Sequence, residues 1–185
     1  YQDAAALECV FPINNADVSF AFAEDQEQVD KLLEIREQCP QLANIYFDDP
    51  RGLRKYDEPG LASLDILLET GKAFASAQPA FFKAEVEKAK PTHVAAMFFT
   101  SGRTGNPKGV VHTHNGLLNA AESGAKFDKL TSAEEVLAYL PPAWIGQNIF
   151  SYSQWLACCY VVNCRESAAT TPIDLKEVAP SYYFA

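Results

Sequence analysis

The sequence predicts an α/β fold with a mostly parallel sheet and flanking helices. Segments with the two-residue periodicity of strands alternate along the chain with segments of helical periodicity, which is the order that parallel strands joined by crossover helices require. Apolar residues make up 48% and charged residues 21% of the sequence, as in globular proteins. A chain of 185 residues can bury a core without disulfides or a structural metal.

The first expected elements are two strands and the helix between them. Residues 18–22 carry apolar side chains at alternate positions, which predicts a strand. From Asp25 the apolar positions follow a helical stripe, so a helix is expected to begin there. A second strand is expected over 44–47. The segment 48–60, rich in Asp, Pro and Gly, is typical of a loop.

The next elements lead to a glycine-rich loop. Ser63 is a candidate cap for a helix that ends near Phe74, and a charged helix is expected over 79–90. The apolar run 94–99 predicts a buried strand, and the loop 100–109 follows it. The later expected elements are, in order, a strand at 110–111, a helix at 115–127, a strand at 136–140, a helix at 145–158, a strand at 160–164, a helix at 173–178 and a strand at 182–184.

The balance of charge excludes one class of partner. The sequence has 15 lysines and arginines against 24 aspartates and glutamates, a formal net charge of −9. Such a field repels phosphate polymers, so nucleic acid is not an expected partner. A small anionic ligand would need a local cluster of cations and hydrogen-bond donors.

Neither a membrane span nor an export signal is expected. The longest uninterrupted apolar run, 155–162, is too short to cross a bilayer, and the first residues lack a signal-peptide pattern. The five cysteines are an odd number without a Cys-x-x-Cys pair, which indicates a reduced, cytoplasmic protein. Cys158 and Cys159 lie within the apolar run and are expected to be buried thiols, with a redox role as the alternative.

The segment 100–109, Thr-Ser-Gly-Arg-Thr-Gly-Asn-Pro-Lys-Gly, has the composition of a phosphate-binding loop. Three hydroxyl residues, three glycines and two cations follow a strand-like run. Glycines let backbone N–H groups approach phosphate oxygens, hydroxyls add donors, and Lys108 supplies a positive charge. Pro107 and Gly109 flank Lys108, so the segment is not a Walker A loop. A flexible surface turn is the alternative interpretation.

The motif Thr-Ser-Gly-x-Thr-Gly-x-Pro-Lys-Gly-Val, which begins at Thr100, resembles the signature of the adenylate-forming superfamily of acyl-CoA synthetases, adenylation domains and luciferases. Segments 140–148 and 180–185 resemble bacterial long-chain fatty acid–CoA ligases. The resemblance is strongest over 97–185, and the chain starts at Tyr1 without a methionine. We therefore expect residues 1–185 to be an internal portion of a large N-terminal AMP-binding domain, with the C-terminal domain absent.

The resemblance implies a two-step reaction that uses ATP, Mg²⁺ and CoA. A carboxylate attacks the α-phosphate of Mg-ATP and releases pyrophosphate, and the CoA thiol then displaces AMP. The loop would cradle the β- and γ-phosphates, with Lys108 as the catalytic cation. The residues implied in nucleotide binding are Thr100, Ser101, Gly102, Arg103, Thr104, Gly105 and Lys108.

Arg103 departs from the superfamily pattern, which usually has a small hydroxyl residue at this place. Two outcomes stay open. The guanidinium could add a bidentate phosphate contact, or its bulk could prevent the loop from closing tightly and so weaken ATP turnover.

Trp144 and Gln147 are the candidate substrate-binding residues, because their segment resembles a wall of the acyl-binding region in related ligases. Core packing of Trp144 beside Phe150 and Trp155 is the alternative. His112 and His114 would point the same way on an extended segment. No third metal ligand lies near them in the sequence, and the resemblance places this Thr-His segment at the start of the next helix, so no metal site is assigned.

These expectations support ATP-dependent activation of a long-chain fatty acid by a longer enzyme. Two alternatives stay open: an adenylating enzyme for an aryl or amino acid, and a non-catalytic nucleotide-binding or interaction protein. The resemblance requires motifs beyond residue 185, so the isolated chain is not expected to complete a turnover. The sequence does not indicate an oligomeric state, and a fatty acid substrate leaves peripheral membrane association open.

Overall fold

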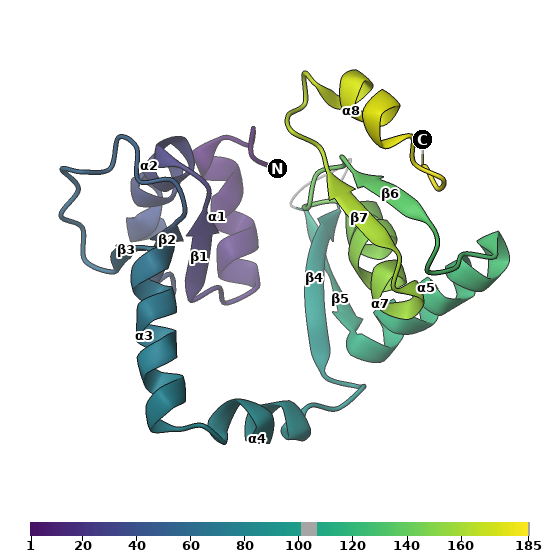
Figure 1. Cartoon of the computed structure of the whole chain (residues 1–185). Helices are drawn as coiled ribbons and strands as arrows, with labels where there is room; N and C mark the ends of the chain where they lie inside the picture. The colour runs from purple at the N-terminus through teal and green to yellow at the C-terminus, as the bar shows by residue number, and fades with distance from the viewer. Residues whose placement is uncertain (101–106, 185) are drawn as a thin grey trace. The chain divides into compact units, whose positions relative to one another are not determined.

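The computed structural model describes residues 1–100 and 107–184 and contains two compact α/β units (Figure 1). The N-terminal unit comprises residues 2–89 and 99–109, and the C-terminal unit comprises residues 90–98 and 110–185. Strands β1, β2 and β3 pair in parallel in the first unit, as β6 and β7 do in the second. The expected α/β class with a mostly parallel sheet is therefore confirmed.

The N-terminal unit is built on the three-stranded sheet, in the order β1-β2-β3. Its elements are α1 (Ala6–Asn15), β1 (Phe20–Ala23), α2 (Gln26–Glu34), the 3-10 helix η1 (Arg36–Gln38), β2 (Asn44–Phe47), β3 (Leu61–Ser63), α3 (Leu64–Ala77) and α4 (Phe81–Lys88). The strand at 44–47 lies where it was predicted. No element was predicted over α1 or β3, and both are present.

One face of this sheet carries the core of the unit. Val29 of α2 and Ile45 of β2 are fully buried, and Ala6 and Ile13 of α1 join the same apolar cluster. In β1 the small residues face this core, whereas the two phenylalanines are exposed and Phe22 stacks on Tyr46 of β2. The alternation in the sequence located the strand, but it did not show that the alanine side would be buried.

The predicted cap Ser63 and the predicted helix start at Asp25 are both present in this unit. The Asp25 carboxylate accepts a hydrogen bond from the Gln28 backbone N–H at 3.2 Å, and the Ser63 hydroxyl accepts one from the Ile66 N–H at 3.4 Å. These side chains satisfy donors that the first turn of a helix leaves unpaired. The local capping signals therefore predicted the starts of α2 and α3 correctly.

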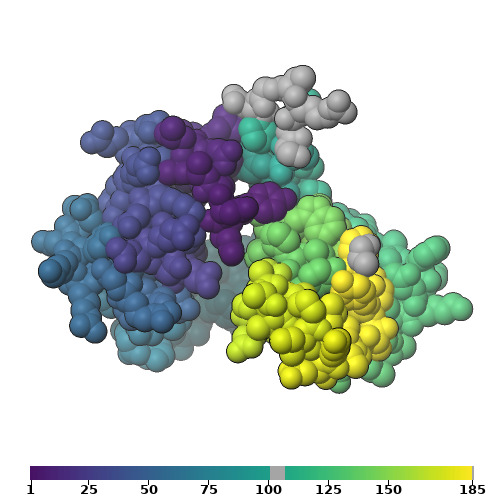
Figure 2. Space-filling model, turned by 90° about the horizontal axis from the view of Figure 1, so that it is seen from above, coloured from purple at the N-terminus to yellow at the C-terminus, as the bar shows by residue number. Residues whose placement is uncertain are grey.

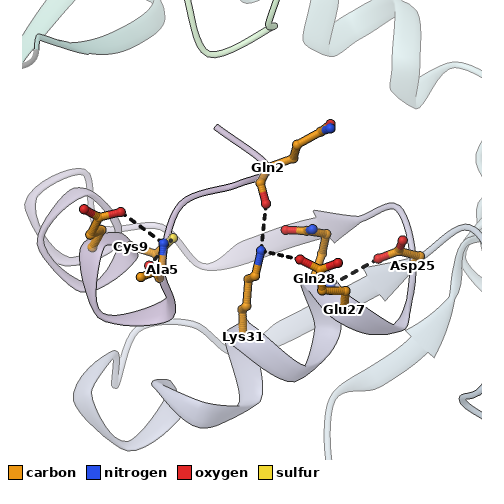
Figure 3. A network of polar contacts seen from close by, with 8 residues as sticks. Gln2, Ala5, Cys9, Asp25, Glu27, Gln28 and Lys31 are labelled. Carbon is orange, nitrogen blue, oxygen red and sulfur yellow. Dashed lines mark hydrogen bonds and ion pairs between the residues drawn. The ribbon is translucent and has the colours of Figure 1, made fainter. Parts of the chain in front are cut away.

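A polar network joins the start of the chain to α2. Figure 3 shows the Lys31 ammonium between the Gln2 carbonyl oxygen and the Glu27 carboxylate, at 2.7 and 2.8 Å. The pair Glu27–Lys31 has the i,i+4 spacing that stabilises helices by a few tenths of a kcal/mol, about 0.2–0.5. The same side chain thus stabilises α2 and fixes the segment before α1.

The C-terminal unit contains Trp144 and Gln147, the two candidate substrate-binding residues. Two-stranded pairing joins β4 (Val94–Thr100) to β5 (Lys108–Thr113), and these strands contribute residues to both units. The later elements are α5 (His114–Asp128), β6 (Glu135–Ala138), α6 (Ile145–Gln147), the π-helical segment η2 (Asn148–Ser153), α7 (Gln154–Cys158), β7 (Val161–Cys164) and α8 (Thr171–Val178). Helix α5 packs against η2 and α7.

Two predicted features of this unit need correction. The expected strand at 182–184 is only a single parallel bridge between Tyr182 and Val136 of β6. In Figure 2 the last described residues, in yellow, lie against the green part of the same unit. Cys158 is partly buried, but Cys159 is exposed, so the expectation of two buried thiols was wrong for Cys159. The reason is its place at the C-cap of α7, where the backbone turns into the left-handed region.

The predicted helix at 145–158 is continuous but not uniformly α-helical. Its middle turn, η2, is π-helical, a rare geometry that is frequent at functional sites. The buried polar side chains of the described residues all lie in this helix: Gln147, Ser151, Ser153 and Gln154. No helix among residues 1–100 and 107–184 is long and apolar enough to cross a membrane.

Candidate functional site

The two described ends of the glycine-rich loop lie together. Thr100 ends β4 and Lys108 begins β5, and the Thr100 hydroxyl donates to the Lys108 carbonyl oxygen at 3.5 Å. Both residues are exposed. The predicted binding residues Ser101, Gly102, Arg103, Thr104 and Gly105 lie outside the described residues. The strands thus bring Thr100 and the backbone of Lys108 together where the loop begins and ends. A hydroxyl and an ammonium group are donors that suit an anionic ligand.

The strand pair continues into the helix that follows it. Farther from the loop, the His112 ring meets the Phe98 ring edge to face, with centroids 5.6 Å apart. The Thr113 hydroxyl accepts from the Gly116 N–H at 3.1 Å and caps α5, of which His114 is the first residue. His112 therefore packs edge to face against an aromatic ring, and His114 begins a helix. The start of this helix agrees with the resemblance.

Trp144 lies at the N-cap of α6 in a group of aromatic residues. Its ring centroid is 5.9 Å from that of Phe184, which stacks on Phe150 at 4.2 Å. The indole is 36% exposed, so it is neither fully packed in the core nor free in solvent. The sequence analysis proposed Phe150 as a core neighbour but missed Phe184, which is 40 positions away and had no signal beyond its aromatic character.

Gln147 is buried at 4% exposure, and its amide is engaged within the protein. Its Oε1 accepts from the Leu140 N–H at 3.2 Å, and its Nε2 donates to the Ser151 Oγ at 2.9 Å. A buried amide with both ends hydrogen-bonded fixes local structure. The side chain therefore joins the segment before α6 to the π-helical turn.

Three tyrosines of this unit, Tyr139, Tyr160 and Tyr182, have raised pKa values, and burial is the largest cause for each. Burial, with a contribution from the Tyr183 hydroxyl, raises the pKa of Tyr139 to about 12. The Tyr139 hydroxyl donates to the Phe184 carbonyl oxygen. Tyr160 is 1% exposed, and burial, followed by the nearby Cys158, raises its pKa well above the ordinary value. The folded unit favours the neutral phenols.

These pKa shifts predict a loss of stability at alkaline pH. A phenol whose pKa rises on folding contributes stability below its unfolded pKa of 10, and this contribution disappears as pH rises through the folded value. We expect the free energy of unfolding to fall between pH 10 and about 12. Urea unfolding at a series of pH values measures it.

A matched pair of variants assigns this effect. Tyr139→Phe should reduce the fall, whereas Tyr152→Phe, at a position 51% exposed in η2, should leave it unchanged. Equal slopes in all three proteins would show that Tyr139 does not contribute.

Comparison with known families identifies the class of protein. The sequence profile described as "AMP-binding enzyme" matches residues 1–183. The chain therefore belongs to the AMP-binding enzyme family. The recognition of the adenylate-forming superfamily from the loop motif is confirmed.

Among curated proteins, the chain is similar to long-chain-fatty-acid–CoA ligases. The chain is 29% identical to the human protein named long-chain-fatty-acid–CoA ligase ACSBG2, over 99% of this chain and 27% of the relative. It is 26% identical to the Xenopus laevis protein of the same name, over 99% of this chain and 25% of the relative. The chain thus spans about a quarter of the length of these relatives.

Solved structures share the fold. An anthranilate CoA ligase, AuaEII, in complex with anthranoyl-AMP superposes with a TM-score of 0.70 at 15% identity, over 100% of this chain and 34% of that chain. A putative long-chain-fatty-acid CoA ligase from Rhodopseudomonas palustris gives 0.68 at 17% identity, over 94% and 39%. At these identities the likeness establishes the fold alone.

Proposed function

We propose that this chain is part of an enzyme that activates a long-chain fatty acid with ATP and then transfers it to CoA. In the first step a carboxylate oxygen attacks the α-phosphorus and pyrophosphate leaves. In the second step the CoA sulfur attacks the acyl carbonyl carbon, and AMP leaves with the original carboxylate oxygen. Mg²⁺ accompanies ATP and offsets the charge of the phosphates.

The observation that carries this proposal is the pairing of Thr100 with Lys108 where the glycine-rich loop begins and ends. This hydrogen bond runs from the Thr100 hydroxyl to the Lys108 backbone carbonyl and joins the two ends of the loop. The Lys108 ammonium then extends from a strand that is held in place, where it can stabilise the negative charge that develops on pyrophosphate. In the proposal Lys108 is the catalytic cation. The remaining nucleotide contacts come from Thr100, Ser101, Gly102, Arg103, Thr104 and Gly105, and Trp144 lines the acyl site.

The proposal places residues 1–185 as an internal portion of the N-terminal AMP-binding domain of a longer enzyme. The coverage of about a quarter of the curated relatives supports it. The five free cysteines support a reducing, cytoplasmic setting. Peripheral contact of the longer enzyme with a membrane would bring it close to a lipid substrate.

Acid-dependent ATP–pyrophosphate exchange by the natural full-length protein tests this function. Long-chain fatty acids should support exchange, and aryl acids and amino acids should not. If an aryl acid or an amino acid supports exchange instead, the proposed adenylation reaction stands, but its substrate is that acid and not a fatty acid. Absence of ATP binding by calorimetry would favour a non-catalytic protein and end the proposal.

A further inference from the structure

Residues next to Trp144 in the sequence fix the segment that carries it, and the distant Phe184 ring lies against the indole. The Gln147 amide bridges the Leu140 N–H and the Ser151 hydroxyl, so the segment 140–144 is tied to the π-helical turn. We call these three residues, Leu140, Gln147 and Ser151, the amide clasp. Because Gln147 is 4% exposed, solvent does not compete for these hydrogen bonds.

Gly146 provides the space that the indole occupies. A Cβ atom added at Gly146 would lie 2.1, 2.3 and 2.5 Å from three carbons of the Trp144 six-membered ring. Real Cβ atoms essentially never approach other atoms so closely, so the ring fits over α6 only because position 146 lacks a side chain. Its other contacts are with the tilted Phe184 ring, and 36% of it stays exposed.

We propose that Gly146 and Gln147 are positioning residues that set the place of the Trp144 indole, and that this indole limits the length of the acyl chain that the enzyme accepts. The second part rests on the proposed function, in which Trp144 lines the acyl site. Gln147 then acts through Trp144, as a residue of the amide clasp, and does not touch the acyl chain itself.

The geometry gives the direction of the effect. A methyl group at position 146 would push the ring away from α6, because its carbon would lie 2.1–2.5 Å from three ring carbons. An acyl chain lying against the opposite face of the ring would lose space, and the longest chains would lose it first. Apolar sites discriminate one methylene by roughly 10- to 200-fold, so a small displacement of a large ring is enough to change selectivity.

The position of the ring can be measured without any enzyme activity. In the full-length protein the fluorescence of Trp144 is the difference between each variant and the same variant that also carries Trp144→Phe. In this difference signal Gly146→Ala should increase iodide quenching, by at most about threefold, the ratio of full exposure to the 36% exposure of Trp144. Gln147→Leu should also increase quenching, because it breaks the amide clasp.

Gly71→Ala is the matched control. Gly71 lies in α3, and a Cβ added there meets no atom within 4 Å, so quenching of Trp144 should stay the same. Unchanged quenching in Gly146→Ala would overturn the positioning role of Gly146. Unchanged quenching in Gln147→Leu would overturn that of the amide clasp.

Selectivity is measured in the natural full-length enzyme with a series of fatty acids. Gly146→Ala should lower kcat/KM for the longest accepted acid about tenfold more than for a medium-chain acid, mainly through KM. Adding Trp144→Leu should restore use of the long acid, because the smaller side chain makes room beside the new methyl group. A general loss of stability would lower kcat/KM equally for both acids, and adding Trp144→Leu would not restore it.

The two proposals fail in different ways. If the full-length protein activates no fatty acid, the proposed function fails, while the quenching results still decide how Trp144 is positioned. If the enzyme is active and quenching rises but the chain-length profile stays the same, the limit on acyl length is overturned and the proposed function stands.

Discussion

In the full-length enzyme, Lys108→Ala should slow fatty-acid-dependent ATP–pyrophosphate exchange by roughly 10- to 1000-fold, equivalent to about 1.4–4 kcal/mol of lost transition-state stabilisation. The reason is electrostatic. Negative charge grows on the departing pyrophosphate, and Lys108 lies at the start of β5 beside the Thr100 hydroxyl, where the loop joins the strand. Exchange kinetics at saturating ATP separate this effect from weaker nucleotide binding.

Two control variants sharpen the result. Lys108→Arg keeps the charge and should retain more of the rate than Lys108→Ala, although its planar group cannot reproduce the ammonium geometry. Lys176→Ala removes an exposed lysine from α8 and should leave exchange unchanged. If Lys108→Ala exchanges at the wild-type rate, Lys108 has no part in the mechanism.

Ile45→Ala should destabilise the N-terminal unit by about 2–5 kcal/mol, the cost of deleting a large buried apolar side chain. Ile45 is fully buried in β2, the central strand of the sheet, and pairs in register with Ala21 and Leu61 on either side. Its side chain joins the cluster that α1 and α2 close from one face. Native-state hydrogen exchange of the β1 and β2 amides measures the loss.

Leu68→Ala is the comparison for this prediction. Leu68 in α3 is 52% exposed, so its truncation should cost a small fraction of the Ile45→Ala effect. Equal protection factors for Ile45→Ala and the unaltered chain would mean that the sheet does not depend on this core.

Local signals explain the parts of the fold that the sequence predicted. Asp25 and Ser63 are capping residues, and a cap acts within three positions of itself, so both helix starts could be located from neighbouring letters. The strand at 44–47 has a compact apolar pattern between polar segments. Helix α1 escaped prediction because it contains Pro12, and β3 because it is only three residues long.

The candidate site also has features that the sequence predicted and features that it did not. The loop motif that begins at Thr100 is contiguous, so the sequence alone indicated phosphate chemistry and the family. Trp144 and Gln147 were singled out through the resemblance of their segment. Their neighbourhood was not predictable, because the Phe184 ring that meets Trp144 lies 40 positions later in the chain.

By itself the sequence determined the α/β class, the helix start at Asp25, the cap at Ser63 and the motif that begins at Thr100. Each of these features depends on residues that are adjacent or regularly spaced in the sequence. Only the tertiary structure decided that the alanines of β1 face the core, that Cys159 is exposed and that Gly146 makes room for an indole. These outcomes depend on which surfaces meet after the chain has folded, because burial and close contact belong to pairs of residues rather than to single positions.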